Sequence, residues 1–218
     1  MQDLTLSQEY LLCTLTEKGR LPVMNTAGPV CLTAGALLEL QLAGCVAFDG
    51  KKVRVTAPLP VEEAHLYTLY NFLDRPKPLS LEKLVEEFHY TFTDSRLSAL
   101  VEGIGGELVR AGAAVEEKGG LLGGKTCYVP QRAAVDAVIE KLRAEILEDG
   151  EATEDAAALA SLLGAAGTLK NYFSRYEQKQ IKDKLRAITQ APAGKMVREM
   201  VEALENMIAV MTAVIAVT

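Results

Sequence analysis

Residues 32–50 read LTAGALLELQLAGCVAFDG, and this stretch decides the fold. From residue 30 to 43 the chain carries no Lys, Arg or Asp and a single Glu. A helix over these residues is apolar on nearly every face and has to be buried. Gly44 stands where helices commonly end in the left-handed conformation. Asp49-Gly50 is typical of a tight turn, and it stands between a short apolar segment over 45–48 and the segment over 53–56, in which apolar and polar residues alternate. The stretch therefore predicts a buried helix, a strand, a tight turn and a second strand.

A second copy of this pattern lies downstream. Glu107-Leu108 and Ala111-Gly112 repeat the spacing of Glu39-Leu40 and Ala43-Gly44, and small or β-favouring residues follow each pair. A pattern that occurs twice argues against a solenoid, which needs three or more repeats. We therefore expect two helix-then-hairpin units, the second with its hairpin over about residues 113–129.

The rest of the chain has helical periodicity. Ser80 is placed to cap a helix with apolar positions from Leu81 to Phe92, and the next helix presents an apolar face from Leu97 to Leu108. Gly103-Ile104-Gly105-Gly106 falls in the middle of that helix, which indicates close packing or a local break. Further helices are expected over residues 5–17, 61–73, 131–148, 153–169, 174–189 and 193–217, with a loop over 20–29. The fold class expected is mainly α, a single compact domain over 1–218 with two short β-hairpins, one protruding.

Composition narrows the class of protein. The chain has 218 residues, of which 49% are hydrophobic and 24% are charged. Its net charge of −6 argues against a protein whose whole surface binds nucleic acid. Four cysteines without CxxC spacing and only two histidines predict no metal site and indicate reduced core cysteines of a cytoplasmic protein. The apolar run over 207–218 is shorter than the roughly 20 residues of a membrane span, so we expect a core helix there.

Four segments in this order resemble the Golgi phosphoprotein 3 family. They are Leu4-Thr5-Leu6 with the apolar helix after it, the helix from Gly35 to Gly44, the helix stop over 107–112, and the apolar run over 205–211. The resemblance covers essentially the whole chain. It implies a single, mainly helical domain with a protruding β-hairpin and no enzymatic activity. The eukaryotic members of that family are peripheral Golgi proteins that bind phosphatidylinositol 4-phosphate and the cytosolic tails of glycosyltransferases.

The chain departs from that family at its lipid-headgroup pocket. The family uses a tryptophan and three arginines there. In an ungapped alignment the tryptophan position is Met24, and the arginine positions are Thr33, Ser98 and Val101. Arginines recognise phosphate through charge-assisted and often bidentate hydrogen bonds. Because all three are replaced, the sequence predicts the family fold without selective binding of phosphatidylinositol 4-phosphate.

A basic stripe is the best candidate for contact with an anionic surface. Arg175, Lys179, Lys182 and Arg186 are spaced by four, three and four residues, so they line one helix face. Such a face suits anionic lipid headgroups or an acidic partner. The alternative is an ordinary solvated face with Glu177 and Asp183 beside it, because exposed basic stripes on helices are common.

The segment 119–126 matches the phosphate-loop pattern G-x-x-x-x-G-K-[ST]. That mechanism needs a helix to begin at the Gly-Lys-Thr, whereas Cys127-Tyr128-Val129 is strand-like here. A glycine-rich hairpin tip fits better. Leu121 and Leu122 stand on it between glycine pairs, so at least one of them is expected to be exposed and to contact a protein partner, a second copy of the chain or a membrane.

No catalytic arrangement emerges, because His65 and His89 lack motif-spaced nucleophiles or carboxylates. The function expected is that of a non-enzymatic interaction protein without a cofactor, cytoplasmic and peripheral at an anionic membrane. Two alternatives stay open. A winged-helix nucleic-acid binder shares the helix-then-hairpin order, although residues 30–43 carry no basic side chain and the helix over 95–111 is balanced in charge. A phosphate-loop nucleotide binder rests on the single pattern above.

Overall fold

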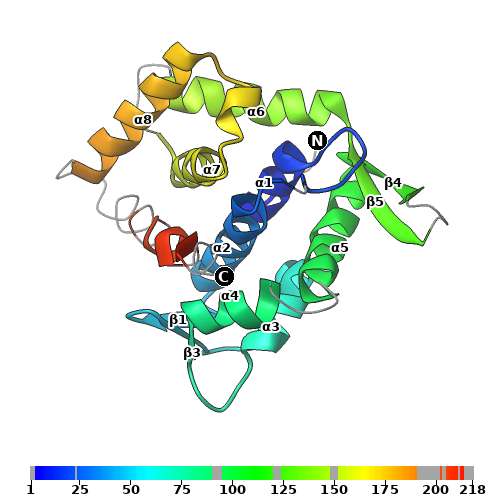
Figure 1. The fold of residues 1–218 in the computed structure, drawn as a ribbon, viewed down its shortest axis with the longest axis vertical. Coiled ribbons are helices and arrows are strands. Elements are labelled where there is room, and N and C mark those ends of the chain that lie inside the picture. The colour runs from blue at the N-terminus through cyan, green and yellow to red at the C-terminus, as the bar shows by residue number, and fades with distance from the viewer. Residues whose placement is uncertain are drawn as a thin grey trace.

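The computed structural model describes residues 3–22, 24–89, 95–119, 124–147, 152–190, 202, 205–210 and 212–213. Within them helices dominate, with two small antiparallel sheets (Figure 1). The helices are α1 (Leu6–Thr14), α2 (Ala27–Leu42), the 3-10 helix η1 (Val61–Leu66), α3 (Tyr67–Leu73), α4 (Leu81–His89), α5 (Ser95–Arg110), α6 (Arg132–Leu147), α7 (Glu154–Ala165), the 3-10 helix η2 (Leu169–Asn171) and α8 (Arg175–Gln190). The strands are β1 (Val46–Asp49), β2 (Lys52–Val55), β3 (Leu79–Ser80), β4 (Ala114–Gly119) and β5 (Lys125–Pro130). The mainly α fold class is confirmed.

The core forms around α1 and α2, which pack against each other in the middle of the molecule (Figure 1). Every residue of α1 is buried, as are twelve of the sixteen residues of α2. Helices α6, α7 and α8 cover one end of this pair, and α3, α4 and the β1–β2–β3 sheet cover the other. The expectation that the apolar stretch is a buried helix is therefore confirmed.

Both helix-then-hairpin units end their helix in the same way. Gly44 and Gly112 have positive φ angles of 73° and 69°. The amide of Cys45 donates to the carbonyl of Leu40 at 2.9 Å, and the amide of Ala113 donates to that of Leu108 at 2.8 Å. These are the 6→1 hydrogen bonds of a Schellman stop. The sequence pattern that occurs twice therefore corresponds to the same type of helix end in both units.

Several local expectations need correction. Helix α1 ends at Thr14 and not near residue 17, and α7 ends at Ala165 and not at residue 169. Helix α2 begins at Ala27, before the predicted end of the loop at residue 29, because proline is tolerated in the first turn of a helix. The first hairpin gains a third strand, β3, in which Leu79 pairs with Val53. The segment predicted as one helix over 61–73 starts as 3-10 helix and becomes α-helix at Tyr67. Much of the helix expected over 193–217 lies outside the described residues, and its part over 205–210 is helical.

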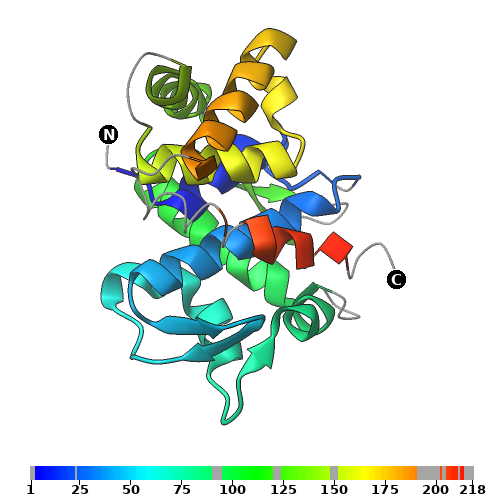
Figure 2. The same cartoon turned by 90° about the vertical axis from the view of Figure 1, so that its left-hand side faces the viewer.

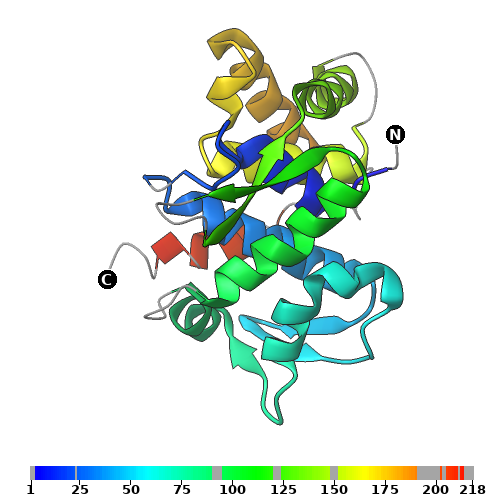
Figure 3. The same ribbon diagram turned by 90° about the vertical axis from the view of Figure 1, so that its right-hand side faces the viewer.

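Two of the glycines inside α5 mark close packing, which is one of the two alternatives that the sequence left open, and the helix runs through them without a break. A Cβ on Gly103 would collide with the main-chain oxygen of His65 in η1, and a Cβ on Gly105 would lie 2.5 Å from Cδ2 of Tyr128 in β5. Helix α5 therefore lies directly on both elements. It holds the β4–β5 hairpin at the edge of the molecule (Figure 3).

Candidate functional site

A pocket of about 540 Å³ opens between the loop after α1, the first half of α5 and strand β5. The loop contributes Arg20 and Pro22, and the strand contributes Lys125 and Tyr128. Helix α5 contributes Ser98 and Val101, which are two of the positions where the resembled family has arginines. The sequence alignment therefore identified residues that share one cavity.

The remaining two headgroup positions lie on different sides of the pocket wall. Thr33 is fully buried, and its Oγ1 lies 3.1 Å from Nε2 of His89, a pocket-lining residue. Met24 is 95% exposed, on the loop that also carries the pocket residues Pro22 and Asn25. The structure thus places Ser98 and Val101 in the pocket, Thr33 behind it and Met24 in solvent beside it.

The pocket has little positive charge. Its two permanent cations, Arg20 and Lys125, stand at exposed positions, and Glu102 opposes them. The Arg20 Nε group lies 3.1 Å from Sγ of Cys127. Burial lowers the pKa of His89 to about 4, so its imidazole is neutral at pH 7. Among the described residues that line this pocket, Arg20 is the one arginine, so the lining does not offer a cluster of arginines to a phosphomonoester. The loss of headgroup selectivity stays a prediction.

The phosphate-loop pattern is not at a helix N-terminus. Lys125 and Thr126 belong to strand β5, where Lys125 pairs with Gly119 and Thr126 pairs with Lys118. The helix N-terminus that a phosphate loop needs at the Gly-Lys-Thr is therefore replaced by a strand at Lys125 and Thr126. The predicted contact residues Leu121 and Leu122 lie outside the described residues, so their exposure stays a prediction.

The family model for Golgi phosphoprotein 3 (GPP34) matches residues 6–204. The chain belongs to the Golgi phosphoprotein 3 family. A search of curated proteins found no match to the chain. In this member of the Golgi phosphoprotein 3 family, the pocket is lined by Ser98 and Val101, the two residues that the ungapped alignment matches to family arginines. Within the described residues, helices long and apolar enough for a membrane span are absent.

The predicted basic stripe exists as an exposed helix face. Arg175, Lys179, Lys182 and Arg186 are all exposed on α8, while Ile181 on the same helix is fully buried against the core. Among the residues that the structure describes, none forms an ion pair with Arg175, Lys179 or Lys182. Of the flanking acids, Glu177 is already bound to Arg143 Nε at 3.1 Å. Arg175, Lys179 and Lys182 therefore present their charge to solvent.

The helix that carries the stripe and the hairpin that borders the pocket lie on opposite sides of the molecule. Figure 2 views the molecule from the side of α8, and Figure 3 views it from the side of the β4–β5 hairpin. The two candidate regions are therefore separate from each other and can be tested by separate substitutions.

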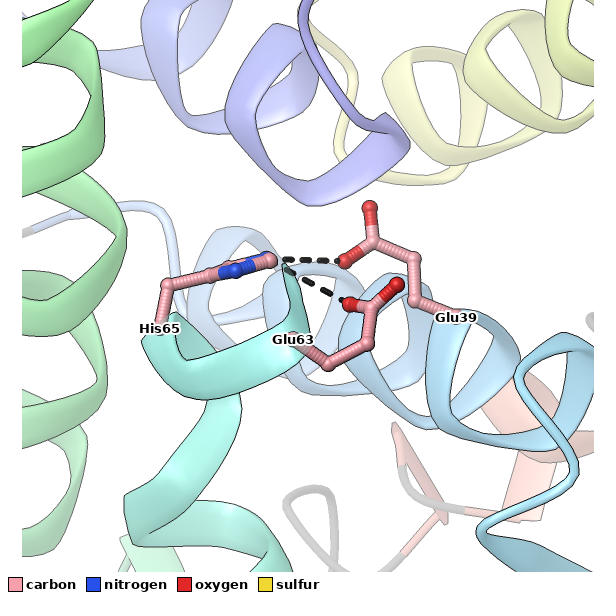
Figure 4. Close-up of side chains that lie close together, drawn as sticks. All are labelled: Glu39, Glu63 and His65. Carbon is pink, nitrogen blue, oxygen red and sulfur yellow. Dashed lines mark hydrogen bonds and ion pairs between the residues drawn. The ribbon is translucent and has the colours of Figure 1, made fainter. Parts of the chain in front are cut away.

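A third cluster joins Glu39 of α2 with Glu63 and His65 of η1 (Figure 4). Nε2 of His65 lies 3.3 Å from Oε2 of Glu39 and 3.8 Å from Oε2 of Glu63. The side chain of His65 is fully buried, and those of Glu39 and Glu63 are 7% and 21% exposed. Cysteine and histidine spacing does not reveal this cluster, because Glu39 lies 26 residues from His65. The one signal in the sequence is that Glu39 is the single charge in an apolar helix.

Charges in this cluster influence one another. Burial alone lowers the pKa of His65, but the hydrogen bond and the negative charge of Glu39, with the charge of Glu63, outweigh it and raise that pKa. Burial and the neighbouring Glu39 carboxylate raise the pKa of Glu63. The amide and hydroxyl of Ser7 both donate to the Glu39 carboxylate, so Glu39 also binds the first turn of α1. Glu39 is therefore held in place from two sides.

Proposed function

We propose that this member of the Golgi phosphoprotein 3 family is a non-catalytic protein that associates peripherally with anionic membrane surfaces through α8. The observation that carries the proposal is the exposed stripe of Arg175, Lys179, Lys182 and Arg186. The exposed Tyr176 stands on the same helix, at 72% exposure, where an aromatic ring suits the headgroup region of a bilayer.

The charge of α8 supports an electrostatic mode of binding. The helix carries five Lys or Arg and two acidic residues, while the whole chain has a net charge of −6. A basic side chain near an anionic bilayer contributes about 1 kcal/mol, so four such side chains give a few kcal/mol. The screening length falls to about 8 Å at physiological ionic strength, so we expect binding to fade as salt is added.

The pocket supports low headgroup selectivity. Ser98 and Val101 replace two of the family's arginines, and Thr33 is buried behind the wall. Charge-assisted bonds to a phosphomonoester are therefore lost at all three positions. We expect phosphatidylinositol 4-phosphate to bind no better than another anionic lipid at equal vesicle charge.

The nucleic-acid alternative finds little support in the helix before the hairpin. Arg96 of α5 donates to the main-chain oxygen of Glu87 and lies over the ring of Phe72, 4.7 Å from its centroid. Arg110 pairs with Glu107 on the same helix. Both arginines of α5 are thus engaged within the protein, so this helix lacks the free basic side chains that a recognition helix uses.

Liposome flotation with paired charge reversals tests the proposal. Lys179→Glu/Lys182→Glu reverses two charges on the stripe, and Arg20→Glu/Lys125→Glu makes the same change in net charge on the pocket side. The vesicles contain phosphatidylserine in phosphatidylcholine, or phosphatidylinositol 4-phosphate at matched net charge. We expect the stripe pair alone to abolish flotation, with both variants folded by circular dichroism.

Three results would contradict this proposal. If the parent protein does not float with anionic vesicles at low salt, the proposed membrane association is excluded. Loss of flotation only in the pocket pair would show that the contact is made by the pocket side and not by α8. Headgroup-selective, submicromolar binding to phosphatidylinositol 4-phosphate would show that the pocket recognises phosphate without the family arginines.

A further inference from the structure

We propose that Glu39, Glu63 and His65 form a binding site for a divalent transition-metal ion of the zinc class. The site is distinct from the α8 stripe and from the pocket at the headgroup positions. The imidazole and the two carboxylates come from α2 and η1, and one ligand atom from each lies within 4.8 Å of the others (Figure 4).

The spacing of the three atoms suits a tetrahedral ion. With metal–ligand distances of about 2.0–2.1 Å, neighbouring ligand atoms of a tetrahedral zinc site lie about 3.3–3.4 Å apart. Nε2 of His65 lies 3.3 Å from Glu39 Oε2 and 3.8 Å from Glu63 Oε2. Small rotations of the Glu63 side chain, which is 21% exposed, would bring the second distance into range. Because the ligand atoms of Glu39 and Glu63 lie within 4.8 Å of each other, the same adjustment would place the three groups at three corners of such a site.

The fourth corner has access to solvent. A cavity of about 340 Å³ is lined by Glu39 and Glu63, and also by Glu9 and Asp155. Glu9 is paired with Lys141 at 3.3 Å, and the other three carboxylates give this cavity a net negative field that favours entry of a cation. A water molecule or a small anion can reach the ion from this side. The arrangement of three protein ligands and one open position is that of exchangeable or catalytic zinc sites.

The polar groups of the cluster are incompletely satisfied without an ion. Oε2 of Glu63 is buried and has no hydrogen-bond partner among the described residues. Two buried carboxylates face a single imidazole, which leaves net negative charge in a region of low dielectric. A divalent ion would neutralise that charge and bind the unpartnered oxygen. It would take the place of the proton that His65 shares with Glu39.

The surroundings also orient one ligand. Ser7 donates its amide and hydroxyl hydrogens to Glu39, so the carboxylate is positioned by groups that are not ligands themselves. Nδ1 of His65 is buried without a partner among the described residues. A metal-bound histidine usually donates this second N–H, so we expect weaker binding than in a closed structural zinc site.

The nitrogen ligand and the short spacing decide the class of ion. Calcium takes six to eight oxygen ligands, and magnesium retains several waters. Imidazole with carboxylates suits zinc, cobalt and nickel better. We therefore expect the cluster to bind Co²⁺ and Zn²⁺ and to discriminate against Ca²⁺ and Mg²⁺.

The experiment is a titration of the chelator-treated full chain with Co²⁺, followed by displacement with Zn²⁺. Tetrahedral cobalt gives intense visible absorption bands, which report coordination directly. Glu63→Gln removes one ligand, and Glu62→Gln removes one negative charge at the neighbouring exposed residue. We expect the bands in the parent and in Glu62→Gln, and at least about tenfold weaker binding in Glu63→Gln.

Thermal unfolding of the parent with and without Zn²⁺ gives an independent measurement that needs no variant. Binding to the native state raises the melting temperature with zinc concentration, and calcium at the same concentration should leave it unchanged. Absence of both tetrahedral bands and thermal stabilisation would overturn the proposal. Equal binding by Glu63→Gln and the parent, or equal loss in Glu62→Gln and Glu63→Gln, would also overturn it.

Discussion

Replacing single glycines of α5 by alanine should produce opposite effects at neighbouring positions. In Gly105→Ala the new Cβ would stand 2.5 Å from Cδ2 of Tyr128 and 2.6 Å from its Cε2 and Cγ. Carbon atoms pack at about 3.5–4.0 Å, so ring and helix must separate by about 1 Å. The ring has little room to move, because Tyr128 is 5% exposed and its hydroxyl donates to the main-chain oxygen of Glu102 at 3.3 Å.

The magnitude follows from two opposing terms. Overpacking of a core costs about 1–3 kcal/mol, and a clash of this size belongs at the upper end. Alanine in place of glycine in a helix regains about 1 kcal/mol. The net loss expected for Gly105→Ala is about 2 kcal/mol, which lowers the melting temperature of a chain of this length by about 4–8 °C.

Gly106→Ala provides the matched control on the same helix. A Cβ at Gly106 meets no atom within 4 Å, so only the gain in helix propensity remains. We expect about 0.5–1 kcal/mol of stabilisation. Thermal and urea unfolding followed by circular dichroism measure both variants. Gly105→Ala as stable as the parent, or Gly106→Ala less stable than the parent, would refute the packing that we describe for α5.

Three further predictions concern pH, thiols and the hairpin tip. The native pKa of His89 lies at about 4, below its ordinary value of 6.5, so the unfolded chain takes up the proton first as the pH falls. The free energy of unfolding should therefore decrease by up to about 3 kcal/mol between pH 6.5 and 4. The free energy of unfolding of His89→Gln, measured by urea unfolding over the same pH range, should lack this part of the decrease. Burial raises the pKa of Cys31 to about 12 and that of Cys13 above its usual range. Maleimide should therefore modify neither thiol until guanidinium unfolds the protein. Rapid labelling of either thiol in the native protein would argue against this burial. Leu121→Ser/Leu122→Ser should reduce self-association measured by sedimentation, and an unchanged mass of a strictly monomeric parent would exclude the tip as a contact between copies.

Local signals in the sequence were sufficient for much of the fold. The Ala-Gly pairs ending at Gly44 and Gly112 act through the backbone of one turn, so their effect can be inferred without tertiary contacts. The same holds for the apolar α2, because a helix without a polar face has to be buried wherever it lies. Strand β3 could not be inferred in this way, since Leu79 pairs with Val53 across a long intervening segment.

The sites depended more strongly on tertiary structure. Ser98 and Val101 could be assigned to a pocket only because the family alignment supplied their roles, and the cavity itself forms between α5, β5 and the loop after α1. The cluster around His65 combines residues that lie far apart in the chain, and two of its three members are glutamates, the commonest of surface side chains. Only the isolated position of Glu39 within α2 distinguishes it in the sequence.

Glu39 also determines how the two central helices can move. Contacts between apolar side chains are non-directional, so α1 could in principle slide along α2 at modest cost. The bonds from Ser7 to Glu39 are directional, and a shift of one residue moves the Ser7 amide by about 1.5 Å, which lengthens and bends both bonds. The hydroxyl of Tyr10 in α1 also donates to the main-chain oxygen of Gly28 in α2 at 2.9 Å. The buried carboxylate of Glu39 and this second bond together oppose sliding of α1 along α2, so the longitudinal register of the core depends on two polar contacts among many apolar ones.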